Sequence, residues 1–122
     1  KYIEGLLFTG NYTKARELLP KLLHSSNPFF KMVHEFFQGY LEEKPSLHFE
    51  KAKGHYNKVL QMCTELSNKT DDFQGFSYLG LGRILEIQNN RKKAVIFYKK
   101  ALETGEYESL KKECRERLRN EL

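Results

Sequence analysis

The chain has 122 residues, a formal net charge of +5, 39% hydrophobic and 30% charged residues, and abundant phenylalanine and tyrosine. This composition can supply one compact domain or a short repeat array with a core, and it argues against disorder, which needs few aromatics. No run of residues has the length and apolar character of a membrane span, and the two cysteines match no metal-binding spacing. Because the chain begins at Lys1 within a helical pattern, we expect an excised domain.

Apolar residues recur at helical spacing almost throughout the chain, and turn residues divide this pattern into about seven segments. No segment alternates between apolar and polar residues as a strand would, so the sequence predicts an all-α fold. We expect helices over approximately residues 1–9, 12–24, 28–42, 46–66, 72–88, 91–104 and 107–122. Short connections between helices of similar length predict antiparallel neighbours.

Helix-capping residues fix several of these boundaries. Asn27 and Pro28 are the preferred residue types for an N-cap and a first helical position. Ser46 is the expected N-cap of the next helix, and Asp71 has capping-box spacing to Gln74. Gly105 is expected to end the helix over residues 91–104 in the usual C-terminal capping role.

Self-comparison shows a repeat. G-N-Y-T-K-A-R-E-L-L at 10–19 and N-N-R-K-K-A-V-I-F-Y at 89–98 share a turn, then an alanine, then a large apolar residue four positions further on. This layout resembles the tetratricopeptide repeat, a helix–turn–helix unit of about 34 residues. The resemblance implies an all-α, right-handed α-solenoid of antiparallel helix pairs with a C-terminal capping helix.

The resemblance divides the chain into a partial repeat over 1–25, an expanded repeat over 28–68, a third repeat over 72–105 and a terminal helix over 107–122. The third copy fits best, whereas in the second copy Phe37 takes the small-residue position. Small and large side chains at matched positions let helices approach closely. The resemblance assigns this helix packing to Ala15, Leu19, Tyr78, Leu81, Gly82, Leu85, Ala94, Tyr98 and Ala101.

Catalytic and cofactor motifs are not found in the sequence. It contains no nucleotide-binding glycine loop, nucleophile elbow or H-E-x-x-H pattern. His48 and His55 read as surface histidines and Cys63 as a core residue, because a metal site needs three or four converging ligands. Gly80-Leu81-Gly82 lies within a helix and predicts helix contact. We therefore predict no enzyme activity, no cofactor and no metal.

Tetratricopeptide arrays present a concave groove lined by the first helix of each unit, so the resemblance implies a scaffold that binds a peptide or protein segment there. The groove residues that it implies are Leu7, Phe8, Lys31, His34, Gln38, Leu41, Phe76, Leu79 and Arg83. The chaperone-binding members use lysine and asparagine at set positions. This chain has Glu4, His34 and Gly80 at positions of that set, so we do not predict a chaperone adaptor.

The basic stretch R-K-K-A-V-I-F-Y-K-K-A-L-E at 91–103 raises an alternative, a module that binds RNA or DNA. Nearby glutamates dilute the charge, and the aromatic residues Phe97 and Tyr98 lie on the apolar side of the helix. We therefore favour a protein partner over a nucleic acid. The run Ala94–Tyr98 is expected to be the packing face and the lysines a solvated face. A sensor or dimerisation segment of a larger regulator or envelope protein is a further alternative.

Overall fold

The computed structural model describes residues 17, 20, 27–44, 46–66 and 71–119. Within these ranges it contains five helices and no strand: α3 (Pro28–Glu43), α4 (Phe49–Glu65), α5 (Asp71–Ile87), α6 (Arg91–Thr104) and α7 (Glu108–Arg119). The predicted helices over 1–9 and 12–24 lie outside the described residues, apart from Glu17 and Pro20. None of the described helices has the length and apolar composition needed to cross a membrane.

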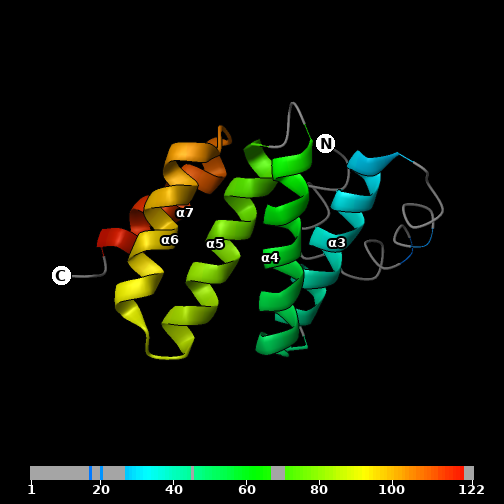
Figure 1. Cartoon of the computed structure of the whole chain (residues 1–122). Coiled ribbons are helices and arrows are strands. Elements are labelled where there is room, and N and C mark those ends of the chain that lie inside the picture. The colour runs from blue at the N-terminus through cyan, green and yellow to red at the C-terminus, as the bar shows by residue number, and fades with distance from the viewer. Residues whose placement is uncertain (1–16, 18–19, 21–26, 45, 67–70, 120–122) are drawn as a thin grey trace.

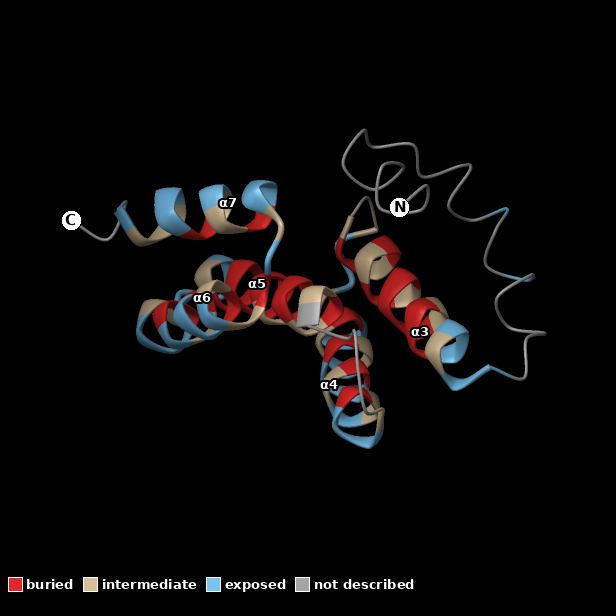
Figure 2. Cartoon of the chain, turned by 90° about the horizontal axis from the view of Figure 1, so that it is seen from above, coloured by how far each residue is buried: buried red, intermediate tan, exposed pale blue. Residues whose placement is uncertain are grey.

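Helix α5 is the centre of the arrangement. It contacts each of the other four helices, whereas α4 and α6 flank it without contacting each other. Figure 1 shows α3, α4, α5 and α6 side by side, with α7 behind α6. Figure 2 shows the molecule from above: the buried residues of each helix lie on the sides that face the neighbouring helices. The described chain is thus an all-α stack of helix pairs.

The cap of α3 confirms the sequence prediction. Asn27 has an extended backbone, and its side-chain oxygen accepts a hydrogen bond from the Phe29 amide at 2.9 Å. This bond satisfies one of the amides that the first turn leaves unpaired, and Pro28 removes another by having no N–H. The helix therefore begins at the predicted residue and ends one residue beyond the predicted boundary.

The predicted cap of α4 is wrong. Ser46 lies outside the helix, which begins at Phe49 with His48 in the N-cap position. Leu47 adopts a left-handed backbone, with φ of 59°, and the His48 amide donates to the Glu42 carbonyl at 2.7 Å. This turn reverses the chain tightly after α3, so it uses residues that the sequence pattern assigned to the helix.

Helix α6 has the predicted bounds, but Gly105 at its C-terminus has a different structural role from the one expected. Asn90 caps its start by accepting from the Lys93 amide, and the Gly105 amide donates to the Ala101 carbonyl. Gly105 is extended rather than left-handed. A Cβ there would collide with the side chain of Leu110 in α7, so glycine is needed for close packing rather than for its backbone angles.

A tyrosine wedged against glycine defines the register of the repeat. In α5 a Cβ at Gly82 would strike the ring of Tyr98, and in α3 a Cβ at Gly39 would lie 3.1 Å from the ring of Tyr56. The position expected for Phe37 therefore belongs to Gly39. Phe37 fits the apolar pattern of the sequence because it is itself a buried core residue of α3.

Candidate interaction surfaces and the buried charge network

Two clusters of the same residue types, the first buried and the second partly exposed, join the helix pairs, and we call them the Tyr–Glu–Arg clusters. In the first, Tyr56 of α4 donates to Glu43 of α3 at 2.7 Å. Arg83 of α5 donates to the same carboxylate through Nε at 2.7 Å and Nη2 at 2.8 Å. Only 1% of Glu43 and 8% of Arg83 are exposed, so this bidentate ion pair is within the core.

The second cluster repeats this pattern one unit later. Tyr98 of α6 donates to Glu86 of α5, which also accepts from Arg91 at 2.6 Å. Arg117 of α7 lies 3.6 Å from the other oxygen of Glu86. Tyrosine, glutamate and the arginine of the next helix pair thus recur in equivalent places.

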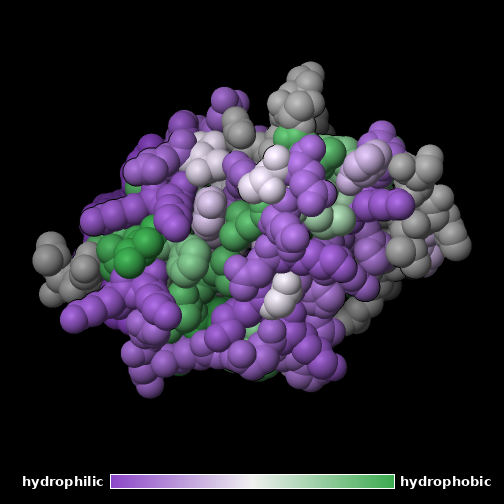
Figure 3. Space-filling view, in the orientation of Figure 1, coloured by the Kyte–Doolittle hydropathy of each residue, from purple (hydrophilic) through white to green (hydrophobic). Residues whose placement is uncertain are grey.

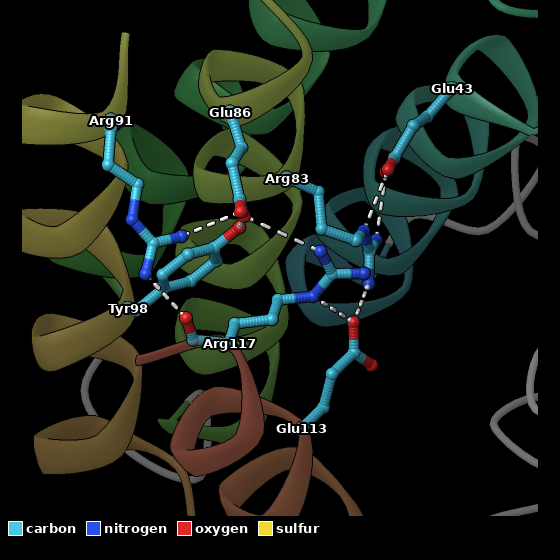
Figure 4. A network of polar contacts seen from close by, with 7 residues as sticks. All are labelled: Glu43, Arg83, Glu86, Arg91, Tyr98, Glu113 and Arg117. Atoms are coloured by element: carbon cyan, nitrogen blue, oxygen red, sulfur yellow. Dashed lines mark hydrogen bonds and ion pairs between the residues drawn. The ribbon is translucent and has the colours of Figure 1, made fainter. Parts of the chain in front are cut away.

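Glu113 of α7 links the two clusters. Its Oε2 accepts from Arg83 at 3.3 Å and from Arg117 at 2.8 Å. Figure 4 shows the seven side chains converging from α3, α5, α6 and α7. Arg83 therefore connects α3, α5 and α7.

The pKa values in these clusters favour a structural rather than a catalytic role. Burial, reinforced by the charge of Glu43, raises the pKa of Tyr56 well above its usual value. Burial would lower the pKa of Arg83, but its bonds to Glu43 outweigh that and raise it. A charged arginine and a protonated tyrosine are thus fixed near neutral pH, so neither exchanges a proton with a substrate.

Glu113 provides a pH test of the network. Burial would raise the pKa of its carboxyl, but the charges and hydrogen bonds of Arg83 and Arg117 outweigh it and hold the pKa below 4.5. The stabilisation is therefore present above the unfolded-state pKa and is lost as pH falls through the lower folded-state value. We expect Glu113→Gln to unfold more easily than wild type at pH 7, with the difference shrinking below about pH 4.5. Urea denaturation at several pH values measures this, and a constant difference would contradict it.

The residues predicted to line the concave groove have different environments. Leu41, Phe76, Leu79 and Arg83 are buried, whereas His34 and Gln38 are half-buried and Lys31 is exposed. Phe76 packs against Phe36 at 6.2 Å and against Tyr107 at 5.9 Å between ring centroids. Leu7 and Phe8, like the packing residues Ala15 and Leu19, lie outside the described residues. The side chains of Leu41, Phe76, Leu79 and Arg83 therefore point into the core of the described helices.

The register of α3 explains why Lys31, His34 and Gln38 are more exposed than the groove residues predicted on α5. With Gly39 equivalent to Gly82, the α3 counterparts of Phe76, Leu79 and Arg83 are Val33, Phe36 and Tyr40. Each lies two residues after the residue predicted from the sequence. The register that predicts Lys31, His34 and Gln38 therefore differs by two residues from the register set by Gly39, so these residues lie on a different side of α3 from Val33, Phe36 and Tyr40.

The packing residues predicted for the third copy form an interior. Leu81, Leu85, Ala94, Tyr98 and Ala101 are buried, and Tyr78 is half-buried with its ring stacked on Phe97 at 6.0 Å. The predicted apolar run of α6 divides between two surfaces. Ala94, Val95 and Tyr98 pack inward, but 52% of Ile96 is exposed. Ile96 therefore lies on an outer surface, whereas the sequence predicts that it belongs to the packing face.

A groove lies over α5 on that outer side, between α4 and α6. It encloses about 350 Å³, and its lining residues are Lys53, Asn57, Leu81, Leu85, Lys93, Ile96 and Phe97. Leu81 and Leu85 form a buried floor, and Ile96 and Phe97 form an apolar wall on α6. Figure 3 shows hydrophobic surface within a mainly hydrophilic face on this side of the molecule.

Lysines border the groove. Lys53 on the α4 side bonds to Glu50 and Gln88, each at 2.9 Å. Lys93 on the α6 side is exposed, and it has no ion pair within the described part of the chain. Lys100 lies two turns beyond Lys93, with its ammonium 5.5 Å from the centroid of the Phe97 ring. No aspartate or glutamate is among the residues that line the groove.

Two sequence signals could have located the Tyr–Glu–Arg clusters. The pattern G-x3-E occurs at 39–43 and 82–86, and A-x3-Y occurs at 52–56 and 94–98. Together they name the glycine, glutamate and tyrosine of both clusters. Hydrophobic periodicity does not indicate the groove, because Ile96 and Phe97 belong to one continuous apolar run in the sequence.

Metal and thiol chemistry have little support in the described residues. No three of their histidine, cysteine, aspartate and glutamate side chains form a group that could hold a metal ion. Cys63 and Cys114 are free and buried, as predicted for Cys63. Burial, aided by the charge of Glu113, raises the pKa of Cys114 to about 11, so this thiol stays protonated and weakly nucleophilic near neutral pH.

Comparison with known proteins agrees with this geometry. A family model described as tetratricopeptide repeat matches residues 48–106, which span the last residue before α4 through the turn after α6. No curated protein and no solved structure matched the chain.

Proposed function

We propose that this chain is a scaffold that holds a segment of a partner protein in the groove between α4 and α6, because residues 48–106 match the tetratricopeptide repeat family, whose members act in protein–protein interaction. The observation that carries this proposal is the exposed Ile96 beside an apolar floor. A concave site with an apolar lining and a few polar groups is the usual form of a binding site.

Burial of Ile96 and Phe97 by a partner would remove apolar surface from water. Full burial of a side chain of this size contributes about 1.5–3 kcal/mol relative to exposure, enough to anchor a short segment. Helix α6 holds both residues firmly, since its inner face packs through Ala94, Tyr98 and Ala101. The wall of the groove is thus presented by a rigid element.

The concave groove predicted from the sequence remains a separate proposal for the same scaffold role. Lys31, His34 and Gln38 are the described residues whose side chains are at least partly exposed there. Alanine substitution of all three would weaken partner binding if that face is used. The division of the chain into repeats at the predicted boundaries likewise remains a proposal.

A peptide selection tests the proposed groove. We expect a displayed peptide library to yield binders of the immobilised wild-type protein. Ile96→Asp places a charge in the apolar wall, and it should weaken these binders by about tenfold or more, because the carboxylate must lose its water when a peptide covers it. Fluorescence polarisation with the recovered peptides measures the change.

Ile87 supplies a matched control. It is an isoleucine with 59% exposure near the end of α5, and it does not line the groove. Ile87→Asp should therefore leave the recovered peptides bound as tightly as wild type. Failure of the selection to yield any binder, or equal binding by Ile96→Asp, would count against the groove as the site.

A further inference from the structure

We propose that the occupant of the groove is an acidic amphipathic helix, with apolar residues facing Ile96 and Phe97 and carboxylates facing Lys93 and Lys100. This inference rests on the proposed function, because it names the chemistry of the segment that the same groove would bind. Three observations carry it: the charges of the residues that line the groove, the spacing between Lys93 and Lys100, and the aromatic contacts that hold Lys100 beside Phe97.

The charges select the sign of the partner. The lining includes two lysines and no carboxylate. Lys53 already has a partner in Glu50, whereas Lys93 is exposed and without an ion pair among the described residues. An incoming carboxylate near Lys93 would gain an attraction that no existing contact supplies, and a basic segment would meet repulsion.

The spacing of the lysines suggests a helix. Lys93 and Lys100 are seven residues apart on α6, which corresponds to two helical turns or about 10 Å along the axis. A helix lying alongside α6 would match this distance with two carboxylates seven residues apart. Apolar side chains three and four residues after the first carboxylate would then lie between them, opposite Ile96 and Phe97.

Aromatic rings hold the side chain of Lys100 in place. Its ammonium lies 5.5 Å from the centroid of Phe97 and 5.7 Å from that of Tyr78, and these two rings stack on each other. This aromatic contact orients Lys100 beside the apolar wall while leaving the donors of its ammonium for a carboxylate. The apolar wall and the positive border are therefore parts of one surface.

Defined peptides test the inference. The acidic probe is the acetylated and amidated peptide A-Q-A-E-A-A-L-L-A-A-E-A-A-Q-A. Matched probes replace both glutamates by glutamine or by lysine, and an oligouridylate of similar length tests for nucleic-acid binding. Titration of the isotope-labelled chain, followed by NMR, measures each Kd and identifies the amides that shift.

We expect the acidic peptide to shift amides of the groove residues and to bind about fivefold or more tightly than the glutamine peptide, with the lysine peptide weakest. Lys93→Glu should weaken the acidic peptide by at least the same factor, and raising the salt from about 50 to 500 mM should reduce the difference. Glutamate near the start of a helix is favourable, so this variant should fold. Lys99→Glu changes an exposed lysine outside the groove and should have little effect.

Each contrary result identifies what is wrong. Equal binding of the acidic and glutamine peptides at the groove, insensitive to Lys93→Glu, would overturn the acidic partner and leave the scaffold proposal intact. Loss of peptide selection together with loss of probe binding would overturn both. Binding of the oligouridylate with a steep salt dependence, and of no peptide, would replace the protein partner with a nucleic acid.

Discussion

Replacing Arg83 by alanine is expected to lower the free energy of unfolding by about 3–5 kcal/mol. The substitution leaves the carboxylate of Glu43 buried with a single remaining donor, the Tyr56 hydroxyl, and a buried charge without its counter-ion is strongly unfavourable. It also removes the contact between α5 and Glu113 of α7. Urea denaturation followed by circular dichroism at pH 7 measures the loss.

A double variant separates charge from packing in this result. Arg83→Met with Glu43→Leu removes both charges and keeps most of the buried volume, so we expect it to recover much of the stability that Arg83→Ala loses. Arg115→Ala, at an exposed position of α7, should change stability by no more than about 0.5 kcal/mol. A small effect of Arg83→Ala would mean that the ion pair is not desolvated as the described contacts require.

Replacing Gly82 by alanine is expected to destabilise the protein by about 1–2 kcal/mol, although alanine is the better helix former. A Cβ at this position would approach the ring of Tyr98 more closely than real side chains tolerate. The ring cannot retreat easily, because its hydroxyl bonds Glu86 and the guanidinium groups of Arg91 and Arg117 lie 6.0 Å from its centroid. Overpacking of this kind costs about 1–3 kcal/mol, and the helix propensity of alanine returns up to about 1 kcal/mol.

Gly54 provides a control in which the same substitution should act in the opposite direction. It lies in α4, and a Cβ there would meet nothing within 4 Å. Only the helix propensity then changes, so Gly54→Ala should stabilise the protein by about 0.5–1 kcal/mol. Thermal unfolding of both variants measures the two signs. Stabilisation by Gly82→Ala would contradict the close approach of α5 to Tyr98.

Both predictions concern the contacts that hold successive helix pairs together. In each cluster the tyrosine of a second helix packs on the glycine of a first helix and bonds a glutamate four residues further along that helix. An arginine from the following unit then completes the charge balance. The recurring pairs Gly39 and Gly82, and Tyr56 and Tyr98, suggest that this contact sets the relation between successive helix pairs.

The sequence predicted several features correctly because their causes are local. Asn27 and Pro28 start α3 by their own chemistry, and Asn90 starts α6 in the same way. The recurrence of apolar residues at helical spacing sufficed for the helix class, and the matched spacing of turn, alanine and large residue sufficed for the resemblance to the tetratricopeptide repeat. By contrast, Ser46 has the right chemistry for a cap, but the turn at Leu47 moved the start of α4 to Phe49.

The sequence by itself determined that this chain is helical, that it repeats and that it resembles the tetratricopeptide repeat, because periodicity, caps and small-residue spacing are read along one dimension. Only the tertiary structure decided the burial of several residues that the sequence predicted for a groove, and the exposure of one that it predicted for the packing face. Phe76 and Leu79 became core residues, Arg83 became half of a buried ion pair, and Ile96 was left exposed beside two lysines. Exposure depends on which helices stand next to one another, and α4 and α6 leave a groove because both pack on α5 without touching each other.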